Sequence, residues 1–157
     1  MTIYTDGACS SKDNIGGWAC VDAEHDENYF GYEENSTNNR MELTAVINAL
    51  ELIKAANDKI NEVYTDSAYV ANCFAQKWYA SWRRNGWRNS SKQAVKNREL
   101  WERLLALHEE IQARYGVILE IIKVDGHAGD KYNELCDKLA VEARKNKRNK
   151  EVNGETN

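Results

Sequence analysis

The order of strand-like and helical segments constrains this chain more than any other feature of its sequence. Three segments rich in β-forming residues come first, at 2–9, 17–24 and 28–33, with short polar connections between them. Such connections join consecutive strands as an antiparallel meander. Helical and strand-like stretches then alternate, which is typical of crossovers between parallel strands. The sequence therefore predicts an α/β fold with a five-stranded mixed sheet, a meander of three strands plus two parallel strands, and helices on both faces.

Apolar periodicity places the remaining elements. Residues recurring at helical spacing from Leu43 to Ile53 predict a helix over 40–56, and Asn39 is its expected N-cap. Further helices are predicted at 67–85 (one or two short ones), 97–115 and 131–144, and strands at 60–65 and 117–124. A chain of 157 residues suits one domain. We therefore expect a single catalytic domain over 1–144 and a polar, flexible tail over 145–157.

Charge is segregated along the chain. The formal net charge is -4, yet residues 67–98 contain seven basic residues and no acidic one. The remainder of the chain therefore carries -11. A basic segment in an acidic protein indicates a surface that binds a polyanion. The acidic residues elsewhere in the chain then suggest a separate site for divalent metal ions.

Neither a membrane segment nor a secretory signal is recognisable, so we expect a cytoplasmic protein. The four cysteines stand singly, without the paired spacing of a zinc site, which predicts reduced thiols.

Four acidic residues stand in distinctive local sequences. They are Asp6 in Thr5-Asp6-Gly7-Ala8-Cys9, Glu42 in Asn38-Asn39-Arg40-Met41-Glu42-Leu43, Asp66 in Tyr64-Thr65-Asp66-Ser67, and Asp137 in Asn133-Glu134-Leu135-Cys136-Asp137. Hard divalent cations such as Mg²⁺ bind a few carboxylates and retain waters that phosphate oxygens can replace. Nucleases commonly use two such ions about 4 Å apart. Converging carboxylates repel one another without metal, so their convergence would indicate a functional site.

Each acid also has a simpler local interpretation. Asp6 before Gly7 fits a turn at the end of a strand. Glu42, three residues after Asn39, fits a capping interaction, and Asp66 fits the N-cap of a following helix. Asp137 fits a solvated helical residue. These alternatives stay open on local grounds.

In combination the motifs resemble type 1 ribonuclease H. The resemblance rests on Asp6-Gly7-Ala8-Cys9, the run Thr37 to Leu43, Thr65-Asp66-Ser67, Gly126-His127-Ala128-Gly129 and Asn133 to Asp137, in the family's order and with similar gaps from Thr2 to Arg144. It implies a ribonuclease H-like fold and an endonuclease that hydrolyses the RNA strand of an RNA-DNA hybrid, leaving 5'-phosphate and 3'-hydroxyl ends. The chain has no recognisable added binding domain, so we expect a stand-alone monomer.

The resemblance also implies roles for the acids. Asp6, Glu42, Asp66 and Asp137 match the family's carboxylate ligands for two Mg²⁺ ions, with Mn²⁺ as a substitute. Asp6 would bridge both ions. His127, in its Gly-flanked loop, matches a mobile histidine that assists proton transfer or product release, a task that suits histidine because this residue type can titrate near neutrality. A solvent-exposed loop histidine is the alternative interpretation.

The basic segment resembles the family's basic protrusion, which contacts the DNA strand. Cations neutralise phosphates, and aromatic faces pack against sugars and bases. The substrate residues predicted from the motifs and from this segment are Gly7, Cys9, Lys12, Thr37, Asn38, Asn39, Trp78, Trp82, Arg83, Arg84, Trp87, Arg88, Ser90 and Asn97. Thr37 and Asn97 match a DNA-phosphate pocket, while Gly7, Cys9 and Asn39 would face the RNA and its 2'-hydroxyls. The spacing of Trp78 and Trp82 also fits two core residues on one helix face.

Some positions depart from the family pattern. Asn35 replaces the phosphate pocket's usual arginine, Ala68 replaces a polar residue, and Ser10 to Ile15 replaces a loop richer in Gly and Pro. Two other hypotheses remain at this level: an integrase-like or transposase-like strand-transfer domain, and a noncatalytic module that binds hybrids. The His127 motif before Asp137 and the basic segment favour the nuclease.

Overall fold

The computed structural model describes residues 1–125 and 130–153. Its elements are β1 (Thr2–Cys9), β2 (Gly16–Asp22), β3 (Glu27–Glu33), α1 (Asn38–Ala56), β4 (Ile60–Thr65), α2 (Ala68–Ala75), α3 (Trp78–Asn85), α4 (Arg98–Gln112), β5 (Ile118–Lys123) and α5 (Lys131–Asn146). Every element predicted from the sequence is present, and the basic segment forms two short helices rather than one. Within the described ranges, no helix has the length and apolarity needed to cross a membrane.

The strands form one mixed sheet in the order β3-β2-β1-β4-β5. β1 pairs with β2 and β2 with β3 in antiparallel fashion, whereas β4 is parallel to both β1 and β5. The predicted meander plus two parallel strands is therefore confirmed. This order puts β1 at the centre of the sheet, with the end of β4 beside it.

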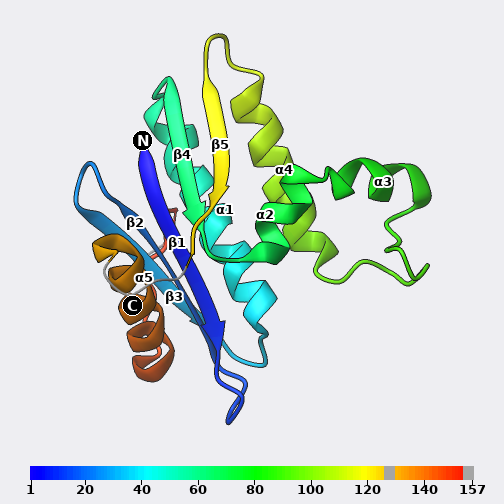
Figure 1. Ribbon diagram of the computed structural model, residues 1–157. Helices are drawn as coiled ribbons and strands as arrows, with labels where there is room; N and C mark the ends of the chain where they lie inside the picture. The colour runs from blue at the N-terminus through cyan, green and yellow to red at the C-terminus, as the bar shows by residue number, and fades with distance from the viewer. Residues whose placement is uncertain (126–129, 154–157) are drawn as a thin grey trace.

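Helices cover both faces of the sheet, as predicted. α1 and α4 pack together on one face, and α5 packs across β1, β2 and β3 on the other (Figure 1). The largest fully buried side chains, Trp18, Trp101, Ile3 and Met41 among them, fill the layer between the sheet and the helices. α3 projects away from this body with the loop that follows it (Figure 1).

The first helix begins earlier than predicted. Thr37 is the N-cap, with extended backbone, and its hydroxyl oxygen accepts a 3.2 Å hydrogen bond from the Arg40 amide. Asn39 is the second residue of the helix, so its prediction as the cap was wrong. The threonine hydroxyl satisfies one of the amides that a helix start leaves without a partner, which fixes the boundary there.

The segment after α5 wraps around the edge of the sheet. The Lys150 amide donates a 2.7 Å hydrogen bond to the Phe30 carbonyl in β3 and its carbonyl accepts a 3.1 Å one from the Phe30 amide. The Tyr32 amide donates to Asn149, and the Val152 amide donates to Asn48 of α1 on the opposite face. The sequence predicted a flexible tail from Lys145. α5 extends to Asn146, and Asn149 and Lys150 lie along the outer edge of β3, where an unpaired strand exposes its polar backbone; the predicted flexibility of the tail stays a prediction.

Candidate active site

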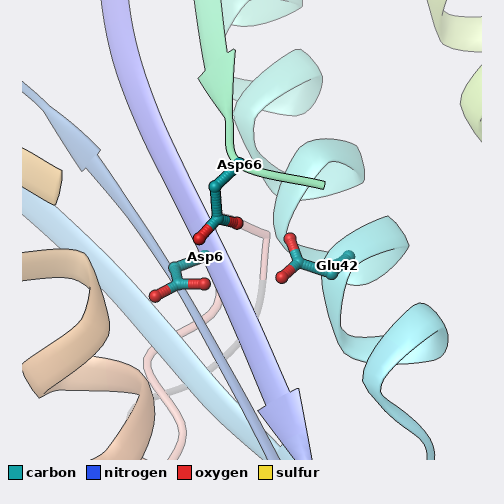
Figure 2. A group of neighbouring side chains, drawn as sticks. All are labelled: Asp6, Glu42 and Asp66. Carbon is teal, nitrogen blue, oxygen red and sulfur yellow. The ribbon is translucent and has the colours of Figure 1, made fainter. Parts of the chain in front are cut away.

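Three of the four predicted acids converge at the centre of the sheet. Asp6 lies in β1, Glu42 in the second turn of α1, and Asp66 directly after β4. One carboxylate oxygen from each lies within 4.8 Å of the others. Figure 2 shows the three carboxylates pointing toward a common space from three separate elements.

The local alternatives for these acids are contradicted by the structure. Asp6 lies inside β1, paired with Ala19, and not in a turn. The helix start is capped by Thr37, which places Glu42 too far along α1 for a capping box. Ser67, not Asp66, is the N-cap of α2, and its hydroxyl accepts a 3.2 Å hydrogen bond from the Val70 amide.

The three carboxylates repel one another, and burial disfavours their charged forms. Burial, followed by the charge of Asp66, raises the pKa of Asp6 to about 7. Burial and the neighbouring Asp6 charge raise the pKa of Glu42 to about 9, and burial also raises the pKa of Asp66. One Glu42 oxygen, Oε2, is buried without a hydrogen-bond partner. A divalent cation would supply the missing counter-charge, and an oxygen-only donor set is what Mg²⁺ and Mn²⁺ prefer.

Asp137 faces the same groove from the opposite side of the sheet. It lies in the second turn of α5, where it lines the groove together with Asp6, Glu42 and Asp66. Its charge contributes to the raised pKa of Asp6, which places the two carboxylates close together. It is not one of the three acids whose oxygens meet within 4.8 Å. The predicted fourth ligand thus borders the acidic cluster.

Comparison with known proteins shows the family to which the chain belongs. A family model described as RNase H matches residues 1–145. The chain is 44% identical to the ribonuclease H of Acetivibrio thermocellus over 149 residues, which is 93% of this chain and 96% of that protein. It is 47% identical to the ribonuclease H of Syntrophomonas wolfei over 147 residues, 92% of this chain and 96% of that protein. The chain belongs to the ribonuclease H family. The predicted type 1 family and ribonuclease H activity are therefore confirmed.

Solved structures agree on the fold. LC9-RNase H1, described as a type 1 RNase H with the type 2 active-site motif, superposes with a TM-score of 0.70 at 28% identity, over 93% of this chain and 72% of that one. A foamy viral protease-reverse transcriptase in complex with dsDNA gives a TM-score of 0.73 at 24% identity, over 91% of this chain and 92% of that one. At that lower identity the likeness concerns the fold alone. The predicted ribonuclease H-like fold is confirmed.

The ribonuclease H groove has a rim of short polar side chains. The groove encloses about 470 Å³, and its lining includes Gly7, Asn38 and Asn39 beside the acids. The Cys9 amide donates a 2.6 Å hydrogen bond to Asn38 Oδ1, which ties the end of β1 to the start of α1. Lys12 is exposed in the turn beyond β1. His127 lies outside the described residues, so the prediction for it stays untested.

The basic segment combines a buried aromatic cluster with an exposed cationic surface. Trp82 is only 7% exposed and packs against Trp101 and Trp87, so the alternative of a core tryptophan describes it better than a surface contact does. Trp78 and Trp87 are half-buried. Arg84, Arg88 and Ser90 are exposed around them, and Arg83 pairs with Glu109.

A network that the sequence analysis missed connects the two predicted phosphate-pocket residues. Arg40 donates to both Glu33 oxygens, at 2.7 and 3.3 Å, and to Glu99 at 2.6 Å. It also donates to Asn97 Oδ1 at 3.4 Å, beside the Thr37 cap. The two carboxylates outweigh the single guanidinium here, and Asn35 adds no charge. The position of Arg40 between Asn39 and Glu42 was visible in sequence, but its partners Asn97 and Glu99 come from a distant segment.

Proposed function

We propose that this chain hydrolyses the RNA strand of RNA-DNA hybrids by two-metal-ion catalysis, leaving 5'-phosphate and 3'-hydroxyl ends. The observation that carries the proposal is the meeting of Asp6, Glu42 and Asp66 oxygens within 4.8 Å, with Asp6 and Glu42 buried and Asp66 half-buried. Carboxylates held this close cost free energy unless a cation neutralises them. The arrangement therefore supports an ion-binding role over a structural one.

Asp6, Glu42, Asp66 and Asp137 would hold the ions. Bound Mg²⁺, or Mn²⁺ in its place, would lower the pKa of a water and stabilise the charge that develops on the leaving 3'-oxygen. The chain itself contributes placement: β1 and α5 present Asp6 and Asp137, while α1 and the end of β4 present Glu42 and Asp66. His127 would assist proton transfer or product release from its loop.

Hybrid recognition divides between the rim and the basic protrusion. Asn38, Asn39 and the backbone at Gly7 and Cys9 lie beside the acids, where hydrogen bonds to 2'-hydroxyls would select RNA. The exposed Arg84, Arg88 and Ser90, with Trp78 and Trp87, offer cations and flat rings for the DNA strand. The negative surroundings of Arg40 support weaker phosphate binding at Thr37 and Asn97 than an arginine at position 35 would give.

The decisive experiment compares labelled RNA-DNA hybrid, duplex RNA and duplex DNA, each with and without Mg²⁺. We expect cleavage of the hybrid's RNA strand alone, and only with the ion. Asp66→Asn should abolish cleavage while leaving hybrid binding largely intact. Asp26→Asn is the matched control, because Asp26 is an exposed turn residue whose positive φ asparagine tolerates. Undiminished cleavage by Asp66→Asn would refute the mechanism.

The proposal includes a monomer that acts in the cytoplasm without an obligate protein partner. All four cysteines are free thiols, three of them buried, which suits a reducing compartment.

A further inference from the structure

α5 approaches the sheet closely at a glycine. Gly17 in β2 lies under the backbone of Ala140, and a Cβ atom at Gly17 would stand 2.0 Å from the Ala140 carbonyl oxygen. The same atom would lie 3.0 Å from Arg144 Cβ. The obstacle at Ala140 is backbone, so no rotamer change relieves it. Any side chain at position 17 therefore requires α5 and β2 to move apart.

The contact lies one helical turn from Asp137, on the same helix. Two further contacts join α5 to β1: the Cys136 thiol donates to the Tyr4 carbonyl at 3.2 Å, and the Tyr132 ring stacks on Tyr4 with centroids 5.4 Å apart. Gly17 pairs with Ala8, two residues along β1 from Asp6. Gly17 thus lies where α5, which carries Asp137, packs on β2 beside the strand that carries Asp6.

We propose that Gly17 is a positioning residue for catalysis, which sets the depth of α5 and thereby the separation of Asp137 from Asp6. This inference rests on the proposed function, because it takes Asp137 as a metal ligand. The residue's contribution is its missing side chain. Its backbone is that of an ordinary paired strand, which other residues also adopt.

A glycine also lies beneath a helix on the opposite face of the sheet. A Cβ atom at Gly7 would lie 2.4 Å from the Met41 carbonyl carbon and 2.6 Å from the Glu42 amide nitrogen. Gly7 pairs with Trp18, the residue after Gly17, and neighbouring strand residues face opposite sides of a sheet. Each helix that presents an acid thus has a glycine beneath it, α1 at Gly7 and α5 at Gly17. Gly7 also borders the groove, so Gly17 gives the cleaner test.

Gly17→Ala is the test. Raising the 2.0 Å separation to an allowed contact moves α5 and β2 apart by at least about 1 Å, and misplacement of that size costs on the order of 100-fold in rate. We expect kcat for hybrid cleavage to fall about 100-fold at fixed Mg²⁺ with little change in KM. An Mg²⁺ titration followed by NMR, with no substrate present, should show weaker ion binding. Unchanged kcat and unchanged Mg²⁺ binding in folded Gly17→Ala would overturn the proposal.

Ile111→Ala controls for general loosening, because Ile111 is fully buried in α4, which carries none of the four acids. It should lower Tm and leave Mg²⁺ binding unchanged; an equal loss of Mg²⁺ affinity in this variant would count against a specific role for Gly17. If Gly17→Ala does not fold, Ala140→Val adds volume at a buried position of the same helix turn, with the same expectations. Absence of cleavage by the unaltered chain would instead refute the proposed function, which separates the two failures.

Discussion

The backbone amide of Cys9 donates a 2.6 Å hydrogen bond to the side chain of Asn38. This bond joins the end of the central strand to the first residue of α1, and it leaves the Asn38 amide group at the groove that holds the acids. One side chain therefore fixes the geometry of the rim and also borders the region where substrate would lie.

Replacing Asn38 should separate these two effects. Asn38→Ala removes a hydrogen bond that contributes about 1 kcal/mol to stability, and it removes a polar group from the rim. Asn38→Asp keeps the acceptor for the Cys9 amide but replaces the donor with a charge. We expect both variants to raise KM for the hybrid, with the free energy of unfolding lowered in Asn38→Ala alone. Steady-state kinetics and urea unfolding measure both; an unchanged KM in Asn38→Asp would exclude a substrate contact.

Removing a buried acid should stabilise the ion-free protein at high pH. The pKa of Glu42 in the folded chain is raised to about 9 from an ordinary value of 4.5, so the folded state retains a proton that the unfolded state has lost. Stability from this group is therefore full below about pH 4 and declines as pH rises toward 9. In EDTA at pH 8, Glu42→Gln should be more stable than the unaltered chain by on the order of 1 to 3 kcal/mol.

Urea unfolding as a function of pH provides the measurement. The difference should vanish near pH 4, where Glu42 is protonated in both states, and saturating Mg²⁺ should reverse the order at pH 8 by stabilising only the chain that retains the acid. A difference that stayed constant from pH 4 to 8 would mean that Glu42 acts through packing and not through its charge.

The basic segment, residues 67–98, should control the salt dependence of hybrid binding. Arg84 and Arg88 are exposed in the segment without acidic residues. Each contact with phosphate that is lost should lower the slope of log K against log salt by about 0.7 to 0.9. We expect Arg84→Gln and Arg88→Gln to raise Kd for the hybrid and reduce this slope, with kcat unchanged.

Arg103→Gln is the matched control, since Arg103 is an exposed arginine of α4 that pairs with Glu51 of α1. Fluorescence anisotropy in increasing salt, with Ca²⁺ replacing Mg²⁺, gives both quantities. Equal slopes for all three variants would remove the basic segment from the binding surface.

The segment 147–153, which follows α5, should protect the edge of β3 from solvent exchange. Lys150→Pro removes the amide that donates to Phe30, while Lys150→Ala retains it. Losing one to two hydrogen bonds, each contributing about 1 kcal/mol, should lower Tm by roughly 2 to 6 °C in a chain of this size. The Phe30 and Tyr32 amides should also exchange hydrogen faster in Lys150→Pro only. Equal exchange rates of these amides in the two variants would show that the Lys150 hydrogen bond does not protect the edge of β3.

Local pattern determined much of the architecture. Runs of β-forming residues placed all five strands, and helical periodicity placed the helices, because burial of one helix face imposes its period directly on the sequence. The motifs around Asp6, Glu42, Asp66 and Asp137 also identified the acids, and the structure brings the first three together with Asp137 at their border. Boundaries were weaker: Thr37 rather than Asn39 caps α1, since either side chain can accept that hydrogen bond and only the backbone path selects one.

Only the tertiary structure decided how closely the elements approach one another. Nothing near Gly17 in sequence predicts that Ala140 lies against it, and nothing near Arg40 predicts Glu33 and Glu99 as its partners. The same holds for Trp82, whose burial depends on Trp101, and for Lys150, which pairs with Phe30 across the length of the chain. The sequence alone identified the candidate acids, because the chemistry that a side chain can perform depends on residue type. Their distances depend on packing between segments remote in the chain, and packing is settled only when the whole core forms.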